Sequence, residues 1–309
     1  MADNYLERQY EQYLAKKAAW EHGGRPGKAT GSVARNRKVC VVTGGAYGIG
    51  RCLVETFVDK GYKVYFIDKE AEQIPVVEKA LQGRQGAAYG FVGDVAEQQT
   101  LEAFAAFVLG REEKIHCLIH NACLMHGGVL EGCSYEDFMY VQRVGVAAPF
   151  YLSHLFKDHF AGLGSIVNIS STRAFQSQTN TESYTAAKGG ITALTHALAV
   201  SLAGIARVNA VAPGWIDTGR YHGPNYHPGA ATGEGLGAYY RPEYAPGDES
   251  QHPSRRIGDP LDIARTVLFL CDEQNSFING QCLCVDGGMS KLMIYNNDYG
   301  WSYAEKHAE

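Results

Sequence analysis

A tyrosine and a lysine four residues apart, Tyr184 and Lys188, are the first pair in the sequence that could do chemistry. Residues with this spacing share one face of a helix, so the ammonium can lie close to the phenol. A phenol titrates near pH ~10 in water, and a nearby positive charge favours its ionised form. Tyr184 is therefore a candidate general acid or base. An aromatic residue and a charge on a solvated helix surface is the alternative interpretation.

Ser171 ends the apolar run 164–171, 13 residues before Tyr184. A hydroxyl at the end of a strand can donate a hydrogen bond to a substrate oxygen and position it. Ser171, Tyr184 and Lys188 are thus the candidate catalytic residues.

A glycine-rich run, TGGAYGIG at 43–50, follows a short apolar run and precedes a helix-favouring segment. A dinucleotide needs a tight turn, close approach of the backbone to its pyrophosphate, and a helix N-terminus aimed at the negative charge. Glycines also serve tight packing, but their place between a strand and a helix favours cofactor binding. The residues expected to contact the cofactor here are Gly44, Tyr47, Gly48, Ile49 and Gly50.

Asp68 ends the next predicted strand, 24 residues after Gly44. A carboxylate there can accept hydrogen bonds from the adenosine ribose and repel a 2′-phosphate, which predicts NAD rather than NADP as cofactor. Asp68 could also cap the following helix. Lys69, one residue on, could instead bind a 2′-phosphate.

Short apolar runs alternate with helix-favouring segments from residue 38 onward. Strands are expected over 38–44, 62–68, 87–95, 114–122, 164–171, 206–214 and 280–288. Helices are expected over 48–61, 70–82, 96–109, 135–160 and 182–203, and from Asp259. This rhythm predicts an α/β fold: a Rossmann-type, doubly wound parallel sheet of about seven strands with helices on both faces.

Two segments stand outside this rhythm. Residues 1–37 read as an N-terminal helical arm and linker, which leaves 38–309 as a single NAD-binding catalytic domain. Residues 217–253 are rich in Gly, Pro and Tyr, and a loop this long inside a domain is usually functional or disordered. We expect this insertion to act as a lid over the substrate, and a surface decoration is the alternative.

Composition excludes several classes of protein. The net charge of −5 argues against a nucleic-acid partner, and no apolar run is long enough for a membrane span. No secretory signal is evident at the N-terminus, so a cytoplasmic protein is expected. The eight cysteines show no CxxC spacing and no metal-ligand cluster, which favours reduced thiols and no bound metal.

These motifs together resemble the short-chain dehydrogenase/reductase family, over about residues 38–290. The glycine turn is similar to its TGxxxGxG pattern and YTAAK at 184–188 to its YxxxK pattern. The resemblance implies further cofactor contacts from Asp94, Val95, Asn121, Pro213, Ile216 and Thr218, together with Tyr184 and Lys188. Lys188 would hold the nicotinamide ribose. Two positions depart from the family: Cys123 stands in its Asn-Ala-Gly motif, and Gly145 replaces a proton-relay Asn, for which Gln142 is a candidate substitute.

The sequence therefore predicts an NAD-dependent oxidoreductase that interconverts a secondary alcohol and a ketone, acting on a small molecule. A non-catalytic NAD-binding sensor or scaffold is the alternative, and the glycine spacing disfavours a nucleotide-sugar epimerase. A homo-oligomer, a tetramer or a dimer, is expected from the long helix and the YxxxK helix. Their pairing residues would be Phe150, Tyr151, Leu155, Phe156, Ala193, Ala197 and Val200.

Overall fold

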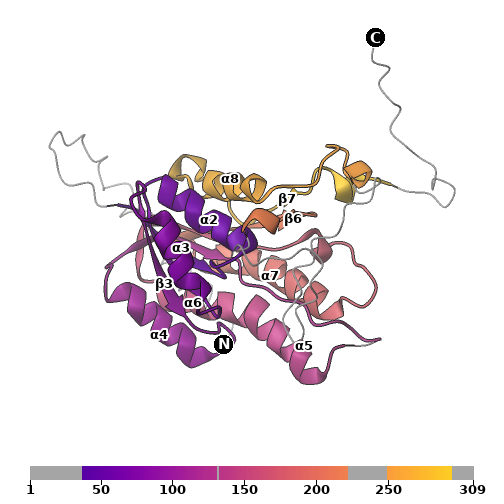
Figure 1. Cartoon of the computed structure of the whole chain (residues 1–309), viewed down its shortest axis with the longest axis horizontal. Coiled ribbons are helices and arrows are strands. Elements are labelled where there is room, and N and C mark those ends of the chain that lie inside the picture. Colours follow the sequence, from indigo (N-terminus) through magenta and orange to yellow (C-terminus); the bar gives the residue numbers. More distant parts are fainter. Residues whose placement is uncertain (1–36, 131, 222–248, 294–309) are drawn as a thin grey trace, which may run out of the picture. The chain divides into compact units, whose positions relative to one another are not determined.

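The computed structural model describes residues 37–130, 132–221 and 249–293, which form a seven-stranded sheet with helices on both faces (Figure 1). The strands are β1 (Val39–Thr43), β2 (Lys63–Asp68), β3 (Ala87–Val92), β4 (Ile115–His120), β5 (Phe160–Ile169), β6 (Ala206–Pro213) and β7 (Cys282–Val285). All pairs are parallel, in the order β3-β2-β1-β4-β5-β6-β7. The Rossmann-like fold predicted from the sequence is confirmed. Residues 1–36 of the predicted arm and linker, 1–37, lie outside the described residues.

Burial on both faces explains why the central strands are mostly apolar. Every residue of β1 and of β6 is buried. The helices are α2 (Gly48–Asp59), α3 (Gln73–Leu81), α4 (Gln98–Leu109), α5 (Tyr135–Gln142), α6 (Ala148–Phe156), α7 (Glu182–Ser201) and α8 (Pro260–Cys271). Phe57 of α2 and Val267 of α8 belong to one apolar core, whereas Phe104 of α4 and Leu152 of α6 belong to a second. The sheet thus separates two cores.

The strand order reverses at β1, whose neighbours are β2 on one side and β4 on the other. Open α/β sheets bind ligands at such a switch point, at the carboxyl ends of the strands. The glycine turn follows β1 and therefore lies at this point.

The prediction of one continuous helix over 135–160 is wrong. A π-helical turn, Arg143–Ala147, separates α5 from α6, and β5 begins as early as Phe160. Pro149 has no amide hydrogen and cannot donate to the carbonyl four residues back, so the regular hydrogen-bond ladder is interrupted here. Sequence periodicity alone does not reveal a wider turn of this kind.

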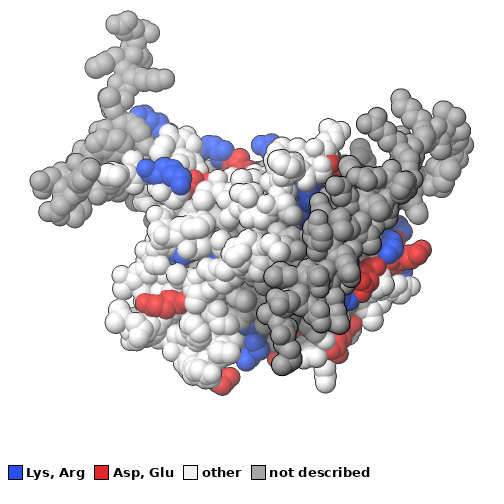
Figure 2. Space-filling view, turned by 180° about the vertical axis from the view of Figure 1, so that it is seen from behind, with Lys and Arg blue, Asp and Glu red and all other residues white. Residues whose placement is uncertain are grey.

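The surface charges and the burial of the cysteines can be compared with what the composition predicted. Figure 2 shows acidic and basic side chains interspersed over the visible face. No helix in the described ranges is long and apolar enough to cross a membrane. All eight cysteines are free, but only Cys40, Cys52, Cys117 and Cys271 are buried. Cys123 and Cys284 are exposed.

Candidate active site

The glycine turn is shaped by backbone conformation and by close packing. Gly44 and Gly48 adopt φ of +69° and +56°, in the left-handed region that favours glycine. A Cβ on Gly50 would lie 1.8 Å from the Gly44 carbonyl oxygen, so a side chain there would fill the turn. The N-terminus of α2 opens directly onto this turn. These features fit a bound pyrophosphate, because free amide groups and the helix dipole both favour an anion there.

Asn121 holds the turn from the neighbouring strand. Its Nδ2 donates to the carbonyl oxygens of Thr43 and Gly44, at 3.2 and 2.9 Å. The Thr43 hydroxyl in turn accepts from the backbone amides of Asn121 and Ala122, both at 3.1 Å. The side-chain amide of Asn121 therefore positions the turn.

Asp68 lies at the carboxyl end of β2, beside the turn. Its Oδ2 accepts from the Ala46 amide at 2.9 Å and its Oδ1 from the Glu70 amide at 3.2 Å. Burial raises the pKa of this carboxyl, and these amide hydrogen bonds oppose the shift. The helix-cap interpretation is wrong, because α3 begins only at Gln73 with Glu72 at its N-cap.

Asp94 lies in the loop that follows β3, and its side chain links this loop to α5 by a hydrogen bond. Its Oδ1 accepts from the Ala96 amide at 2.8 Å, and its Oδ2 accepts from the Tyr140 hydroxyl at 2.5 Å. The neighbouring Val95 is buried. Tyr140 had no motif to mark it, so sequence reasoning missed this contact.

Ser171, Tyr184 and Lys188 come together where β5 ends and α7 begins. Ser171 is buried, and its Oγ accepts from the Arg173 amide at 3.1 Å. Lys188 is only 3% exposed; its Nζ donates to the Ile169 carbonyl at 2.7 Å and lies 5.3 Å from the centre of the Tyr184 ring. The carbonyl at the end of β5 thus anchors the ammonium beside the phenol.

The electrostatics of this group correct the simplest expectation. Lys188 does lower the pKa of Tyr184, as do Ser171 and Arg173, but burial has the larger effect and the net pKa is raised. The pKa of Lys188 is also raised, because Cys123 and Tyr184 together outweigh the opposing effect of burial. At neutral pH, therefore, the Tyr184 phenol keeps its proton and Lys188 is an ammonium.

Gly145 lies in the π-helical turn and faces α7. A Cβ on Gly145 would lie 2.8 Å from the Ala187 Cβ, so an Asn would fit only if the two helices moved apart. Gln142 does not occupy that space: its Nε2 donates to the Ser183 carbonyl at 2.9 Å. Gln142 therefore supports the first turn of α7, next to Tyr184.

The segment after β6 is fixed at its start. Gly214, directly after Pro213, donates its amide to the Val285 carbonyl at 3.0 Å, and Ile216 forms a β-bridge with Gly258. Thr218 follows in the same stretch. The greater part of the predicted lid, 222–248, lies outside the described residues.

Two residues near the catalytic group were not among the predicted site residues. Cys123 follows β4 and has its thiol within hydrogen-bonding reach of Lys188, and Arg173 acts on Tyr184 through its charge. Cys123 was visible in the sequence only as a departure from a motif. Arg173 could have been noticed from its place two residues after Ser171.

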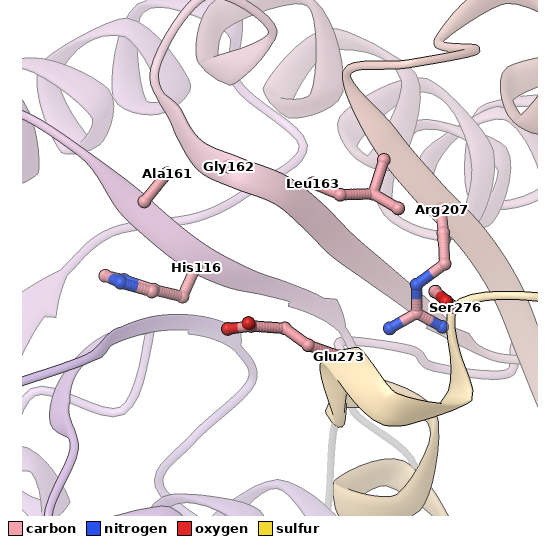
Figure 3. A pocket seen from close by; sticks show the side chains of 7 residues that line it. All are labelled: His116, Ala161, Gly162, Leu163, Arg207, Glu273 and Ser276. Atoms are coloured by element: carbon pink, nitrogen blue, oxygen red, sulfur yellow. The ribbon is translucent and has the colours of Figure 1, made fainter. Parts of the chain in front are cut away.

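A cavity of about 380 Å³ lies at the opposite edge of the sheet. Figure 3 shows its lining residues, His116, Ala161, Gly162, Leu163, Arg207, Glu273 and Ser276, which belong to the early parts of β4, β5 and β6 and to the segment after α8. None of the predicted site residues lines it. In the described part of the chain, no cluster of three or more His, Cys, Asp or Glu could hold a metal ion.

The parallel sheet, the glycine turn at its switch point and the Ser-Tyr-Lys group define a dinucleotide-binding oxidoreductase. Comparison with known proteins supports this class: the family described as Enoyl-(Acyl carrier protein) reductase matches residues 44–290. An uncharacterized oxidoreductase of Thermotoga maritima is 36% identical over 84% of this chain and 98% of its own length. The chain belongs to the short-chain dehydrogenase/reductase family.

Two solved structures are similar over about four-fifths of this chain. A 7α-hydroxysteroid dehydrogenase complexed with NADH and 7-oxo glycochenodeoxycholic acid is 29% identical, with a TM-score of 0.70 over 81% of this chain and 93% of that one. A protein described as a putative gluconate 5-dehydrogenase from Beutenbergia cavernae, with bound NADP, is 27% identical, with a TM-score of 0.69 over 82% and 97%. Nicotinamide cofactors of both kinds therefore occur among the neighbours.

Proposed function

We propose that this protein is an NAD(H)-dependent oxidoreductase that interconverts a secondary alcohol and a ketone, with Tyr184 as general acid and base. One observation carries the proposal. Ser171, Tyr184 and Lys188 lie together at the carboxyl edge of the sheet, with the Lys188 ammonium 5.3 Å from the Tyr184 ring. The glycine turn follows β1 at the same edge.

Each of the three side chains has a distinct part. The Ser171 oxygen accepts from the Arg173 amide and its hydroxyl hydrogen-bonds Tyr184, so a substrate oxygen that enters between the two would take that donor. Tyr184 gives a proton to that oxygen in reduction and takes it back in oxidation. Lys188, held by the Ile169 carbonyl, stabilises the phenolate that remains. A bound nicotinamide supplies or accepts the hydride.

The preference for NAD over NADP rests on Asp68. Two backbone amides orient its carboxylate at the glycine turn, where a negative charge opposes a 2′-phosphate. Lys69 is the counter-argument, because a flexible ammonium one residue on could accept that phosphate. The amide contacts support Asp68, whose position is the better fixed of the two.

A homo-oligomer, a tetramer or a dimer, is also proposed. Phe150 of α6 and Val200 of α7 are 53% and 78% exposed, and Ala193 and Ala197 of α7 are exposed as well. Apolar residues gathered in this way are seldom left in water. Phe156 does not belong to this face, because it is fully buried. Light scattering at micromolar protein is expected to give a multiple of the 33.7 kDa chain mass, and a monomeric mass would refute the proposal.

A substrate panel with purified protein tests the proposed activity. Oxo acids, sugars and ring ketones are offered with NADH and, separately, with NADPH, and the absorbance of the reduced cofactor is followed. Turnover with NADH that exceeds turnover with NADPH supports the proposal. The sensor alternative predicts that NADH binds, as measured by its fluorescence, without being consumed by any compound. The cytoplasmic location stays a prediction from the sequence.

A further inference from the structure

Arg173 occupies a distinctive place beside the catalytic group. It lies in the short 3-10 turn Thr172–Ala174, two residues after Ser171, and its amide donates to the Ser171 hydroxyl oxygen. Its positive charge lowers the pKa of Tyr184, so the guanidinium lies within electrostatic range of the phenol. The backbone of Arg173 therefore contacts one of the two groups that would hold a substrate oxygen, and its charge acts on the other.

The hydrogen bonds of this guanidinium are incomplete. One terminal nitrogen donates to the Gln178 side-chain oxygen, whereas the other, Nη1, is buried and bonds to no described residue. No carboxylate of the described residues forms an ion pair with Arg173. A half-buried cation without a counter-ion loses hydration and gains little in return.

Two other arginines of the same fold show the contrast. Arg51 of α2 forms an ion pair with Glu55, at 3.0 Å. Arg207 of β6, which is almost fully buried, donates to the carbonyl oxygens of Asp272, Asn275 and Ile278. Arg207 also has one buried nitrogen, Nε, without a partner, but its two terminal nitrogens are both bonded. In Arg173 a terminal nitrogen, Nη1, has no described partner, and the charge of this residue acts on Tyr184.

We infer that Arg173 binds a carboxylate of the substrate, so that the substrate is an oxo acid or the corresponding hydroxy acid. The inference rests on the proposed function, because it places the reacting oxygen of the substrate between Ser171 and Tyr184. A planar guanidinium matches a carboxylate in geometry and in charge. One guanidinium supplies one positive charge, which fits a carboxylate better than a phosphate dianion.

A structural role is the competing interpretation: Arg173 would simply fasten its turn to Gln178. The variants Arg173→Gln and Gln178→Ala separate the two. Arg173→Gln removes the charge and keeps a polar side chain, whereas Gln178→Ala removes the protein partner and keeps the charge. A structural role predicts the same defect in both variants, and carboxylate binding predicts a defect only in Arg173→Gln. Arg173→Lys, which keeps the charge without the fork, should recover part of the loss.

Substrate pairs that differ only in charge provide the measurement. Acetoacetate and levulinate are compared with their methyl esters as substrates for reduction, with inorganic phosphate as an added competitor. Wild-type protein should prefer the acid by about tenfold or more in kcat/KM, the size expected for one hydrogen bond to a charged group. Arg173→Gln should lose that preference mainly through KM for the acid, so that acid and ester become equal substrates, and any effect on Tyr184 should change kcat for acid and ester alike. Equal use of acid and ester by wild type, or a preference that survives in Arg173→Gln, would overturn the inference.

A binding measurement keeps this test independent of turnover. Calorimetric titration of the same four compounds into protein saturated with NAD⁺, which cannot reduce them, reports carboxylate binding directly. If the affinity for the acids falls about tenfold in Arg173→Gln, the inference is supported even when no compound turns over. The absence of turnover would count against the proposed function instead. If acids bind no better than esters, or if phosphate displaces them and binds more tightly, the carboxylate assignment is wrong.

Discussion

The two edges of the sheet both carry polar side chains, but they use them differently. At the amino edge, the cavity in Figure 3 is lined by His116, Arg207 and Glu273. His116 accepts from the Val39 amide, and Glu273 pairs with Lys38 at 2.7 Å. Burial and the charge of Lys38 lower the pKa of His116, so that imidazole stays neutral. Apart from the Arg207 Nε, which has no partner among the described residues, the polar groups named here are bonded within the protein.

At the carboxyl edge, the side chains retain hydrogens that can be donated to another molecule. Ser171 accepts from a backbone amide and hydrogen-bonds Tyr184, which keeps its proton because burial raises its pKa. Arg173 has one terminal nitrogen without a protein partner among the described residues. A hollow in the surface is therefore a poorer guide to chemistry here than the state of the hydrogen bonds around it. The following predictions test that contrast, from the largest expected effect to the smallest.

Replacing Tyr184 by Phe should give the largest effect on activity. The ring remains and the proton is lost, so kcat should fall by about 10²- to 10⁴-fold while NADH affinity is retained. Steady-state kinetics and NADH fluorescence measure the two quantities. Tyr89→Phe is the matched control, because Tyr89 stacks on Tyr65 at the β3 edge of the sheet. Near-normal turnover in Tyr184→Phe would place the general acid elsewhere.

Arg207→Met, at the amino edge, should lower the stability of the fold and leave the activity unchanged. The carbonyl oxygens of Asp272, Asn275 and Ile278 each lose a charged donor and keep one other donor, and the loss should lower the free energy of unfolding by about 3 kcal/mol. Activity per folded molecule should be unchanged. Lys38→Ala, which breaks an exposed ion pair at the same edge, should cost less than about 1 kcal/mol. Urea denaturation gives both values, and a loss of kcat in folded Arg207→Met would contradict the division between the edges.

Asp68→Ala should alter the choice of cofactor by about tenfold, through a loss of NAD affinity and a relaxed exclusion of NADP. The ratio of kcat/KM for the two cofactors is the readout. Lys69→Ala is the control, and it should leave the ratio nearly unchanged. If unaltered protein uses NADP as well as or better than NAD, the role of Asp68 as a discriminator is wrong.

The smallest expected effect is a change in the pH at which Tyr184 ionises, measured in the cofactor-free protein. Its raised pKa means that the phenol stays protonated through neutral pH and ionises only above the ordinary value of ~10. A difference titration at 295 nm, wild type minus Tyr184→Phe, should therefore show no phenolate from this residue between pH 6 and ~9. Arg173→Gln should shift the onset further upward. A phenolate signal near neutral pH would show that Lys188 outweighs burial.

Local pattern was sufficient for most of the fold. The seven apolar runs became the seven strands, and the predicted helix near Asp259 begins at Pro260, where Asp259 accepts from the Leu261 amide at 2.8 Å. The long helix was the exception, because its interruption depends on a missing amide at Pro149 and on packing against α7. Residue periodicity contains no information on packing of that kind.

The site was predictable where spacing in the chain fixes proximity in space. Tyr184 and Lys188 are one helical turn apart, and the glycine turn must follow its strand directly, so the sequence by itself determined both. Tertiary structure decided what surrounds them. Burial, which depends on every neighbouring element, reversed the expected direction of the Tyr184 pKa shift. Likewise, only packing against Ala187 shows why position 145 is a glycine, and only the folded chain leaves the Arg173 guanidinium beside the phenol without a carboxylate from the described residues.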